Sequence, residues 1–291
     1  MGEGVIIKGI GGFYYIMTET GEEVRCRMKG SFRTKDIKPA VGDRVTFSEE
    51  EHGDGVVTAI RERVNYITRP SAANVDYSLV VFAVRDPDPD YLLLDKLLAD
   101  NVLKDVPSDI CITKCDLADP GEVDYIRDNY RDACEKIFTV ASLDGEGIEE
   151  IKEFLKGKTT LLRGVSGAGK SSLINALTGD EIQQTGEISR KTRRGKNTTR
   201  ASVLIPLEPD TFILDTPGFS EFTLKDIEYD SLWEYYPEFY EHSDCRYMNC
   251  VHINEPGCEV KAAVASGEIS SLRYGNYKTI YEEMKKAPKE Y

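Results

Sequence analysis

The sequence predicts a multidomain α/β protein: a small antiparallel β-barrel, a doubly wound sheet with helices on its faces, and a helical module with clustered cysteines. Three observations predict this class. Short apolar runs broken by turns fill the first 67 residues, strand and helix patterns alternate after them, and strand patterns stop after Phe222. A chain of 291 residues suffices for two or three domains. We expect their bounds at 1–67, 68–222 and 223–291.

The barrel is predicted by five short apolar or alternating runs, at residues 4–10, 12–17, 23–28, 43–48 and 55–60. Strands of this length and spacing suit a five-stranded barrel of the oligonucleotide-binding (OB) type, or an SH3-like barrel. A barrel that only supports its neighbours remains an alternative to one that binds a ligand, because a fold does not dictate a function.

The middle region is predicted to be a mostly parallel sheet, because apolar strand patterns alternate with helical patterns. The expected strands are 77–84, 109–116, 136–142 and 159–163, and the expected helices are 91–105, 122–133, 147–156 and 171–179. Residues 201–207 and 211–218 are expected to pair antiparallel around a turn. The helix at 91–105 has an amphipathic pattern.

A phosphate-binding loop is predicted where the strand at 159–163 meets the next helix. The run GVSGAGKS, residues 164–171, matches GxxxxGK[ST] in the required strand–loop–helix context, which disfavours a glycine-rich turn without a ligand. Backbone N–H groups and the helix N-terminus would face phosphate oxygens, with Lys170 as a point charge and Ser171 as a ligand of Mg²⁺. The expected nucleotide contacts are Gly164, Val165, Ser166, Gly167, Ala168, Gly169, Lys170, Ser171 and Ser172.

Two further motifs follow apolar strands. In DTPG, residues 215–218, Asp215 would hold Mg²⁺ through water and the Gly218 N–H would face a γ-phosphate. DTPG alone is a common turn, and its distance after the phosphate loop gives it this meaning.

The sequence TKCD, formed by Thr113, Lys114, Cys115 and Asp116, predicts a choice of base. The Asp116 carboxylate can accept from both N1–H and the 2-amino group of guanine, whereas adenine offers a ring acceptor and no 2-amino group. The Lys114 stem can pack on the base, and Ser142 is placed to bring backbone N–H groups to guanine O6. The nucleotide is therefore expected to be GTP.

These motifs stand in a permuted order. Common GTPases begin with the phosphate loop and end with the base-selecting motif, but here TKCD and VAS precede GVSGAGKS, which precedes NTT and DTPG. The order is G4-G5-G1-G2-G3, a circular permutation. A parallel sheet tolerates it, because the site depends on where the loops converge and not on chain order.

A cysteine cluster predicts one structural zinc ion. Cys245, Cys250, His252 and Cys258 form a CxxxxCxHxxxxxC pattern. Three thiolates and an imidazole make a closed tetrahedral set for Zn²⁺, with no open position for catalysis. Free thiols beside a histidine and an iron–sulfur site are the alternatives, and the spacing favours zinc.

The charge pattern bears on partners. The formal net charge is −14, yet residues 189–200 carry six basic residues and no acid. A local basic patch can still bind nucleic acid, since physiological salt screens distant charge within ~8 Å. We find no apolar stretch that could span a bilayer and no signal-peptide pattern, so we expect a cytoplasmic protein without a membrane partner. We also expect a monomer.

Together these features resemble the RsgA (YjeQ) family, the ribosome small-subunit-dependent GTPases. The resemblance covers essentially the whole chain, through VGD at residues 41–43, RPSAANVD, TKCD, GVSGAGKSSL, GKNTT, DTPGF and SDCRYMNCVH. It implies an OB-type barrel, a permuted GTPase domain and a zinc domain. It also implies a GTPase that binds the small (30S) ribosomal subunit with its 16S rRNA, is stimulated by it and assists its late maturation.

The first switch of the GTPase would lie between the phosphate loop and DTPG. Thr199, with Thr198 as the alternative, is expected to ligate Mg²⁺ when GTP is bound. The same ordering would place basic residues against rRNA phosphates, unless the run is only a solvated charged segment. The expected RNA contacts are Arg190, Lys191, Arg193, Arg194, Lys196 and Arg200.

The switch departs from the family pattern at two positions: Asn197 stands where the family usually has a histidine, and Arg200 stands in place of the third threonine. Phe219 stands where many other GTPases carry the glutamine that orients water. Asn197 and Thr199 remain the candidates for a catalytic role, and slow unstimulated turnover is expected. The alternative functions are an RNA-binding assembly factor with GTP mainly as a binding switch, and a small-molecule phosphoryl-transfer enzyme.

Overall fold

The computed structural model describes residues 1–32, 38–48, 53–68, 71–141, 145–179, 202–215 and 224–287. Their contacts divide the chain into two compact units. The first contains the described residues of 1–78, 148–162 and 171–217, and the second those of 79–147, 163–170 and 218–291. Each unit therefore joins segments that are distant in sequence.

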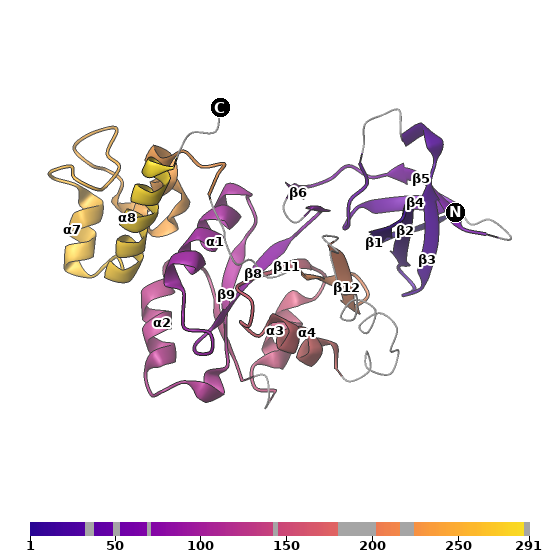
Figure 1. Ribbon diagram of the computed structural model, residues 1–291, viewed down its shortest axis with the longest axis horizontal. Helices are drawn as coiled ribbons and strands as arrows, with labels where there is room; N and C mark the ends of the chain where they lie inside the picture. The colour runs from indigo at the N-terminus through magenta and orange to yellow at the C-terminus, as the bar shows by residue number, and fades with distance from the viewer. Residues whose placement is uncertain are drawn as a thin grey trace. The chain divides into compact units, whose positions relative to one another are not determined.

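The N-terminal segment forms the predicted closed five-stranded barrel (Figure 1). Its strands are β1 (Gly2–Ile10), β2 (Phe13–Thr18), β3 (Glu23–Met28), β4 (Arg44–Ser48) and β5 (Gly55–Ile60). They follow the order β1-β2-β3-β5-β4, in which β3 and β5 pair in parallel and the other pairs are antiparallel. Alternate strand residues fill the barrel, as the period of two requires: Ile6, Ile16, Cys26, Val45, Phe47 and Val57. This confirms the OB-type barrel.

A short hairpin follows the barrel, and the sequence did not predict it. It consists of β6 (Tyr66–Thr68) and β7 (Ser71–Ala73). Two buried polar residues fix the chain around it. The Asp43 carboxylate accepts 2.7 and 2.8 Å hydrogen bonds from the Arg63 guanidinium, and the Asn74 side chain bonds Val64 N and Gly42 O, each at 2.9 Å. Asp43 and Gly42 of the VGD motif therefore have a structural role, because they bind the segment that follows the barrel through Arg63 and Asn74.

The sheet of the middle region has six strands in the order β10-β9-β8-β11-β13-β12. They are β8 (Tyr77–Ala83), β9 (Ser108–Thr113), β10 (Ile137–Val140), β11 (Thr159–Arg163), β12 (Val203–Glu208) and β13 (Thr211–Asp215). Strand β9 pairs in parallel with β10, and β11 pairs in parallel with β13. Strand β12 pairs antiparallel with β13, as predicted. The helices of this region are α1 (Tyr91–Leu103), α2 (Glu122–Tyr130), α3 (Ile148–Leu155) and α4 (Lys170–Thr178).

Strand β8 is covered on both faces. Val80 and Phe82 belong to an apolar cluster with residues of α1 and α2, and the alternating Leu79 and Val81 on the other face are equally buried. A strand buried on both faces is typical of a doubly wound sheet. The predicted fold class is confirmed.

Helix α1 lies where its pattern predicts it, but it is buried on more than its apolar face. Leu94 and Leu97 pack in the cluster of β8 and β9, while Ala99 belongs to the apolar core of the C-terminal module. Polar residues that an exposed face would carry, Asp95 and Asp100, are buried. The helix is therefore enclosed between two cores.

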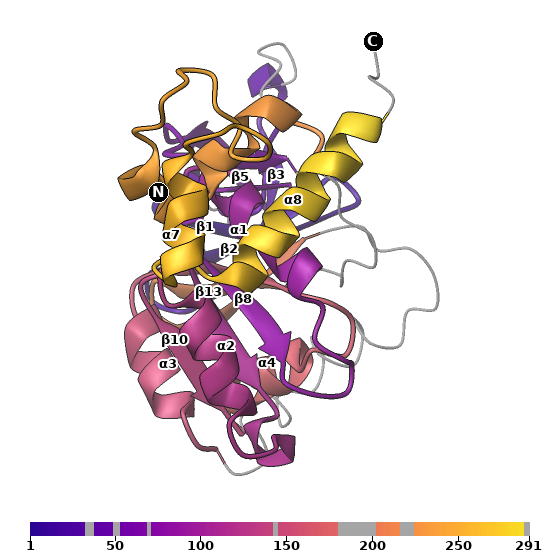
Figure 2. The same cartoon turned by 90° about the vertical axis from the view of Figure 1, so that its left-hand side faces the viewer.

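The described residues 224–287 form a helical module without strands, as predicted. It contains the 3₁₀ segments η3 (Tyr229–Tyr235) and η4 (Pro237–His242) and the helices α7 (Glu259–Ser266) and α8 (Ser271–Lys286), which Figure 2 shows side by side. Aromatic rings fill its core, including Tyr236, Phe239 and Tyr277. Shorter 3₁₀ turns follow β3 (η1, Gly30–Phe32) and β9 (η2, Cys115–Leu117).

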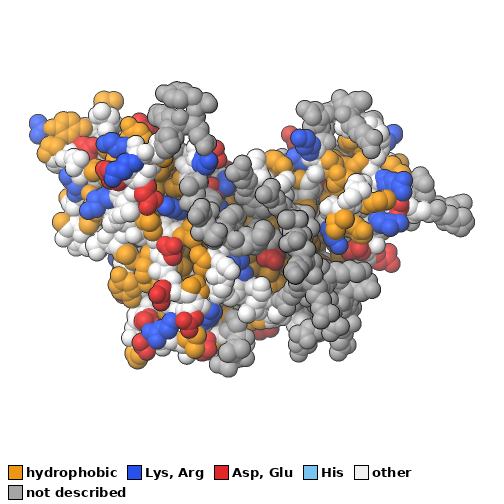
Figure 3. Space-filling view, in the orientation of Figure 1, with side chains coloured by type: hydrophobic (Ala, Val, Ile, Leu, Met, Phe, Trp, Pro, Cys, Tyr) orange, Lys and Arg blue, Asp and Glu red, His pale blue; other side chains and the backbone are white. Residues whose placement is uncertain are grey.

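Two surface properties complete the description. No helix in the described ranges is both long and apolar enough to cross a bilayer. On the barrel, Lys and Arg side chains lie among hydrophobic ones on the face seen in Figure 3, and Arg25 and Arg27 lie over the Phe13 ring at 5.1 and 4.7 Å.

Candidate functional site

The phosphate loop begins where β11 ends and stops where α4 begins, at Lys170. Gly164 has φ +146°, and a Cβ there would lie 2.2 Å from the Val81 carbonyl oxygen of β8. Gly167 and Gly169 also have positive φ, at +83° and +90°. The loop can curl in this way only because these positions lack a Cβ. The predicted strand–loop–helix is confirmed.

Lys170 reaches back over the loop. Its ammonium donates to the carbonyls of Gly164 and Val165, each at 2.7 Å, and the side chain is buried. The charge is therefore held within the curl of the loop, next to backbone N–H groups that favour anions. This places a cation where the phosphates of a nucleotide would bind.

The base-selecting motif meets the same loop. Thr113 ends β9, is fully buried, and donates a 2.7 Å hydrogen bond from its hydroxyl to the Ala168 carbonyl. Lys114 follows with φ +58°, and its ammonium donates to the Asp86 carbonyl. The Thr113 bond ties the end of β9 to the phosphate loop, so one ligand can contact both, and the Lys114 bond ties it to the segment that follows β8.

The two other members of the motif have different surroundings. Asp116 is exposed in η2, where its carboxylate is accessible to a base. Cys115 instead turns its thiol to the Ile112 carbonyl at 3.4 Å and packs against the apolar cluster of β8 and β9. Its burial raises the pKa of the thiol, which makes it a packing group and a poor nucleophile.

The predicted magnesium ligands lie on two elements of the first compact unit. Asp215 is the last residue of β13 and pairs in register with Leu162 of β11, two residues before the phosphate loop begins at Gly164. Ser171 is in the first turn of α4 and is exposed. A hydroxyl and a carboxylate are oxygen ligands of the kind that Mg²⁺ prefers, so these residues fit it.

Several predicted residues lie outside the described ranges. They are the guanine contact Ser142, the γ-phosphate contact Gly218, the candidates Asn197, Thr198 and Thr199, Phe219, and the basic residues Arg190, Lys191, Arg193, Arg194, Lys196 and Arg200.

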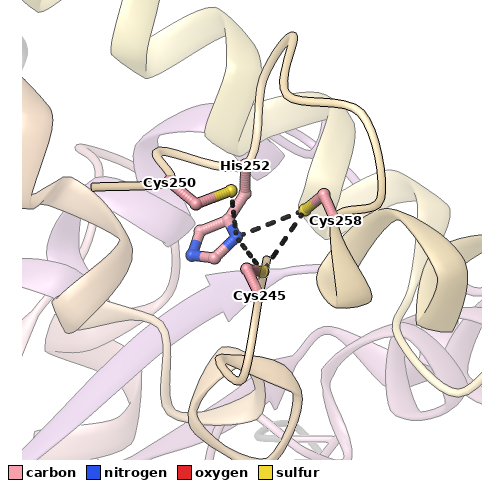
Figure 4. Close-up of side chains that lie close together, drawn as sticks. All are labelled: Cys245, Cys250, His252 and Cys258. Carbon is pink, nitrogen blue, oxygen red and sulfur yellow. Dashed lines mark hydrogen bonds between the residues drawn. The ribbon is translucent and has the colours of Figure 1, made fainter. Parts of the chain in front are cut away.

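The cysteine cluster is brought together as the spacing predicts. Figure 4 shows the four side chains pointing toward one another. The His252 Nδ1 atom lies 3.6, 3.5 and 3.4 Å from the Sγ atoms of Cys245, Cys250 and Cys258, and the Cys245 and Cys258 sulfurs are 3.9 Å apart. Tetrahedral zinc with usual bond lengths separates sulfur and nitrogen ligands by about 3.6 Å and two sulfurs by about 3.8 Å. The residues fit zinc.

The electrostatics of the cluster also suit a cation. Burial raises the pKa of Cys250 to about 12 and also raises the pKa of Cys258, so the thiolates that bind a metal would be costly to form there without one. Burial lowers the pKa of His252, which keeps the imidazole neutral and able to ligate. A divalent cation supplies the charge that the thiolates need.

Two residues that the sequence patterns did not identify support the cluster. The Glu255 carboxylate accepts from the backbone N–H groups of Val251, Ile253 and Asn254, at 3.1, 2.9 and 3.0 Å. The Tyr274 hydroxyl donates to the His252 carbonyl at 2.8 Å. Glu255 could have been suspected from the sequence, because it is a carboxylate within the short interval between His252 and Cys258. No local sequence pattern predicts the contact of Tyr274.

Residues 60–225 match the family described as RsgA GTPase, and residues 3–57 match the RsgA N-terminal domain. Proteins called small ribosomal subunit biogenesis GTPase RsgA are similar to it over almost their full length. That of Agathobacter rectalis is 44% identical over 98% of this chain and 99% of its own, and that of Clostridium beijerinckii is 44% identical over 97% of each.

Two solved structures are similar as well. YjeQ from Thermotoga maritima matches with a TM-score of 0.83 at 33% identity, over 99% of each chain. YloQ, described as a circularly permuted GTPase, matches with a TM-score of 0.81 at 35% identity, over 100% of this chain and 97% of its own. The permuted strand and motif order therefore has solved counterparts.

Proposed function

The chain belongs to the RsgA family of GTPases, and from this premise we propose that it hydrolyses GTP on the small ribosomal subunit and assists the late maturation of that subunit. The observation that carries the nucleotide part is the hydrogen bond from Thr113 to Ala168, which joins the base-selecting strand end to the phosphate loop. The names of the relatives support the ribosomal part. The protein would act as a cytoplasmic monomer.

In this proposal the base and the phosphates are bound by different elements. Asp116 accepts from guanine while the Lys114 stem packs on the base and Ser142 presents N–H groups to O6. Residues 164–172 bind the phosphates, with Gly218 at the γ-phosphate. The selection of guanine and the binding of phosphate can therefore be tested separately.

Ser171, Asp215 and Thr199 would hold Mg²⁺. When bound, the ion neutralises charge that develops on the β- and γ-phosphate oxygens. The chain's own contribution is to orient the phosphates with backbone N–H groups and Lys170. Asn197 and Thr199 are the candidates for orienting water, since Phe219 cannot do so, and a subunit that orders this segment would raise turnover.

We propose three domains, at 1–67, 68–222 and 223–291, with one structural zinc ion in the third. The contacts with 16S rRNA would be made by Arg190, Lys191, Arg193, Arg194, Lys196 and Arg200. Nucleotide state and RNA affinity would then be coupled, because the same segment would carry Thr199 and the basic residues.

Co-sedimentation with purified small subunits tests the proposal. We expect the chain to sediment with subunits more strongly with GTP or a non-hydrolysable analogue than with GDP, and ATP to have no effect beyond that of buffer. Equal sedimentation in all nucleotide states would favour the RNA-binding module without a nucleotide switch. Equal affinity for ATP and GTP would favour the small-molecule phosphoryl-transfer enzyme.

The basic segment has its own test. Replacing Arg193, Arg194 and Lys196 by Ala should weaken GTP-dependent sedimentation and reduce its salt dependence, because phosphate contacts release counterions. A matched control replaces the exposed Arg131 and Lys156, which should leave both unchanged. Identical salt dependence of the triple variant and the unaltered chain would refute the assigned contacts.

A further inference from the structure

Helix α1 carries two buried carboxylates, and each is paired with a buried arginine. The Asp95 carboxylate pairs with Arg273 of α8, and Asp100 pairs with Arg163 at the end of β11. All four residues belong to the second compact unit and are at most 4% exposed. The two pairs are alike in chemistry but differ in position, because only Arg163 adjoins the phosphate loop.

Arg163 is fully buried and firmly bound. Its Nη1 lies 2.6 Å from an Asp100 carboxylate oxygen and 2.7 Å from the Asn101 amide oxygen, both on α1. The Lys104 ammonium also pairs with Asp100, so this carboxylate is shared by two cations. These contacts fix the guanidinium in one place relative to α1.

The backbone that follows Arg163 is fixed on its other side. The next residue, Gly164, lies so close to the Val81 carbonyl oxygen of β8 that no Cβ fits between them. The Gly164 carbonyl in turn accepts the 2.7 Å hydrogen bond from Lys170. A movement of Arg163 would therefore change the direction of the Gly164 carbonyl and the position of the Lys170 ammonium.

Stability alone does not account for a charged pair at this place. A buried ion pair costs desolvation, and well-packed apolar residues of similar volume are often equally or more stabilising. The other residues of β11 are Thr159, Thr160, Leu161 and Leu162, all buried without a charge. The strand carries its one charged side chain at the last position before the loop.

We infer that Arg163 is a positioning residue for the nucleotide phosphates, which it serves by holding the Gly164 peptide and hence Lys170 through Asp100 and Asn101 of α1. The inference rests on the proposed nucleotide binding. It predicts that loss of the pair weakens contacts with the phosphates and spares contacts with the base, because Asp116 lies on the segment that follows β9.

The experiment compares dissociation constants for GDP and for guanosine in the full chain. The test variant is Arg163→Met with Asp100→Asn, which removes both charges of the pair, and Lys104, the other partner of Asp100, keeps access to solvent with 19% of its side chain exposed. Its GDP affinity should fall roughly tenfold, the effect of losing charge-assisted hydrogen bonds that support the loop, while guanosine affinity stays unchanged. Arg163→Lys keeps the charge on a shorter side chain and should lie between.

Asp95→Asn is the control, since it makes the Asp→Asn part of the change in the other pair on the same helix, where Arg273 keeps Glu238 as a partner. It should lower the thermal midpoint without changing the ratio of GDP to guanosine affinity. A ratio that is unchanged in both Arg163 variants, or altered equally by Asp95→Asn, would overturn the inference. If the double variant does not fold, Arg163→Lys decides the same question. Failure of the unaltered chain to bind GDP would instead contradict the proposed function.

Discussion

The phosphate loop and the cysteine cluster are both built to receive a ligand, but they differ in what the chain itself supplies. In the loop, the Gly164 and Ala168 carbonyls accept from Lys170 and Thr113, so the curl is bonded by protein groups. In the cluster, three thiols and the His252 Nδ1 face one another at 3.4 to 3.9 Å, and burial raises the pKa of Cys250 to about 12.

This difference indicates how each site depends on its ligand. A loop that is already bonded can keep its shape when the nucleotide leaves, as turnover requires. A bound zinc ion would stabilise the largely buried thiols of the cluster, so that metal binding and folding of the C-terminal module would become one event. Four changes test the contrast, from the largest expected effect to the smallest.

Removing zinc should have the largest effect. Structural zinc binds small modules with ~10–16 kcal/mol, as much as a whole domain's stability, so a chelator or Cys258→Ser should unfold the C-terminal module. Trp233 is the chain's single tryptophan, and its ring lies 5.3 Å from the His252 ring, so its fluorescence should report the loss. Cys134→Ser, outside the cluster, is the control and should keep full zinc content. Unchanged Trp233 emission after chelation would contradict the claim that folding of the C-terminal module depends on zinc.

Gly164→Ala should be the most damaging single change in the phosphate loop. The new Cβ would lie 2.2 Å from the Val81 carbonyl oxygen at φ +146°, which should cost at least about 3 kcal/mol of unfolding free energy. GDP affinity should also fall by more than about tenfold, because the displaced carbonyl moves Lys170.

Gly121→Ala is the control that separates the two effects of Gly164→Ala: the backbone strain of a positive φ and the steric clash with the Val81 carbonyl oxygen. Gly121 also has positive φ, at +88°, but no atom lies within 4 Å of a Cβ there. It should cost only ~1 kcal/mol and leave GDP binding intact. Similar losses at both glycines would show that the contact with β8 is unimportant.

Asp116→Asn should change the preferred base while sparing both the fold and the phosphates. One of the two acceptors for guanine becomes a donor, so GTP affinity should fall about a hundredfold, or ~2.8 kcal/mol. A xanthine nucleotide, whose 2-oxo group accepts from the new amide, should bind better than before. Competition binding with GTP, XTP and ATP measures this, and unchanged GTP affinity would remove Asp116 from the site.

Thr113→Val should have the smallest effect. It removes the hydroxyl that donates to Ala168 and leaves a buried carbonyl with one bond fewer, at a cost of ~1–2 kcal/mol. Nucleotide affinity should fall severalfold, and Thr113→Ser should restore it because the donor returns. Equal behaviour of the Val and Ser variants would show that the bond does not hold the loop.

The sequence predicted those parts of the molecule whose chemistry is local. GVSGAGKS and the cysteine spacing each need a particular residue type at a fixed offset, and both places were correctly predicted to form a loop and a cluster. The strands of the barrel and sheet followed from periodic apolar residues in the same way. The base-selecting residues and magnesium ligands remain predictions until a nucleotide is bound.

Features that depend on distant partners were not predicted. The amphipathic pattern of residues 91–105 predicts a helix with one polar face, but Asp100 and Asp95 are buried, because they pair with Arg163 and Arg273, which are distant in the sequence. The hairpin of β6 and β7 is too short for a periodic pattern, and its place depends on Asn74 bonding to Gly42. No local pattern encodes such pairings.

Steady-state GTP turnover, measured with increasing amounts of purified small ribosomal subunits, is the decisive test of subunit-stimulated hydrolysis. We expect slow hydrolysis by the chain alone, a saturable increase with small subunits, and no comparable hydrolysis of ATP. Turnover that is already fast without subunits and does not respond to them would contradict this expectation.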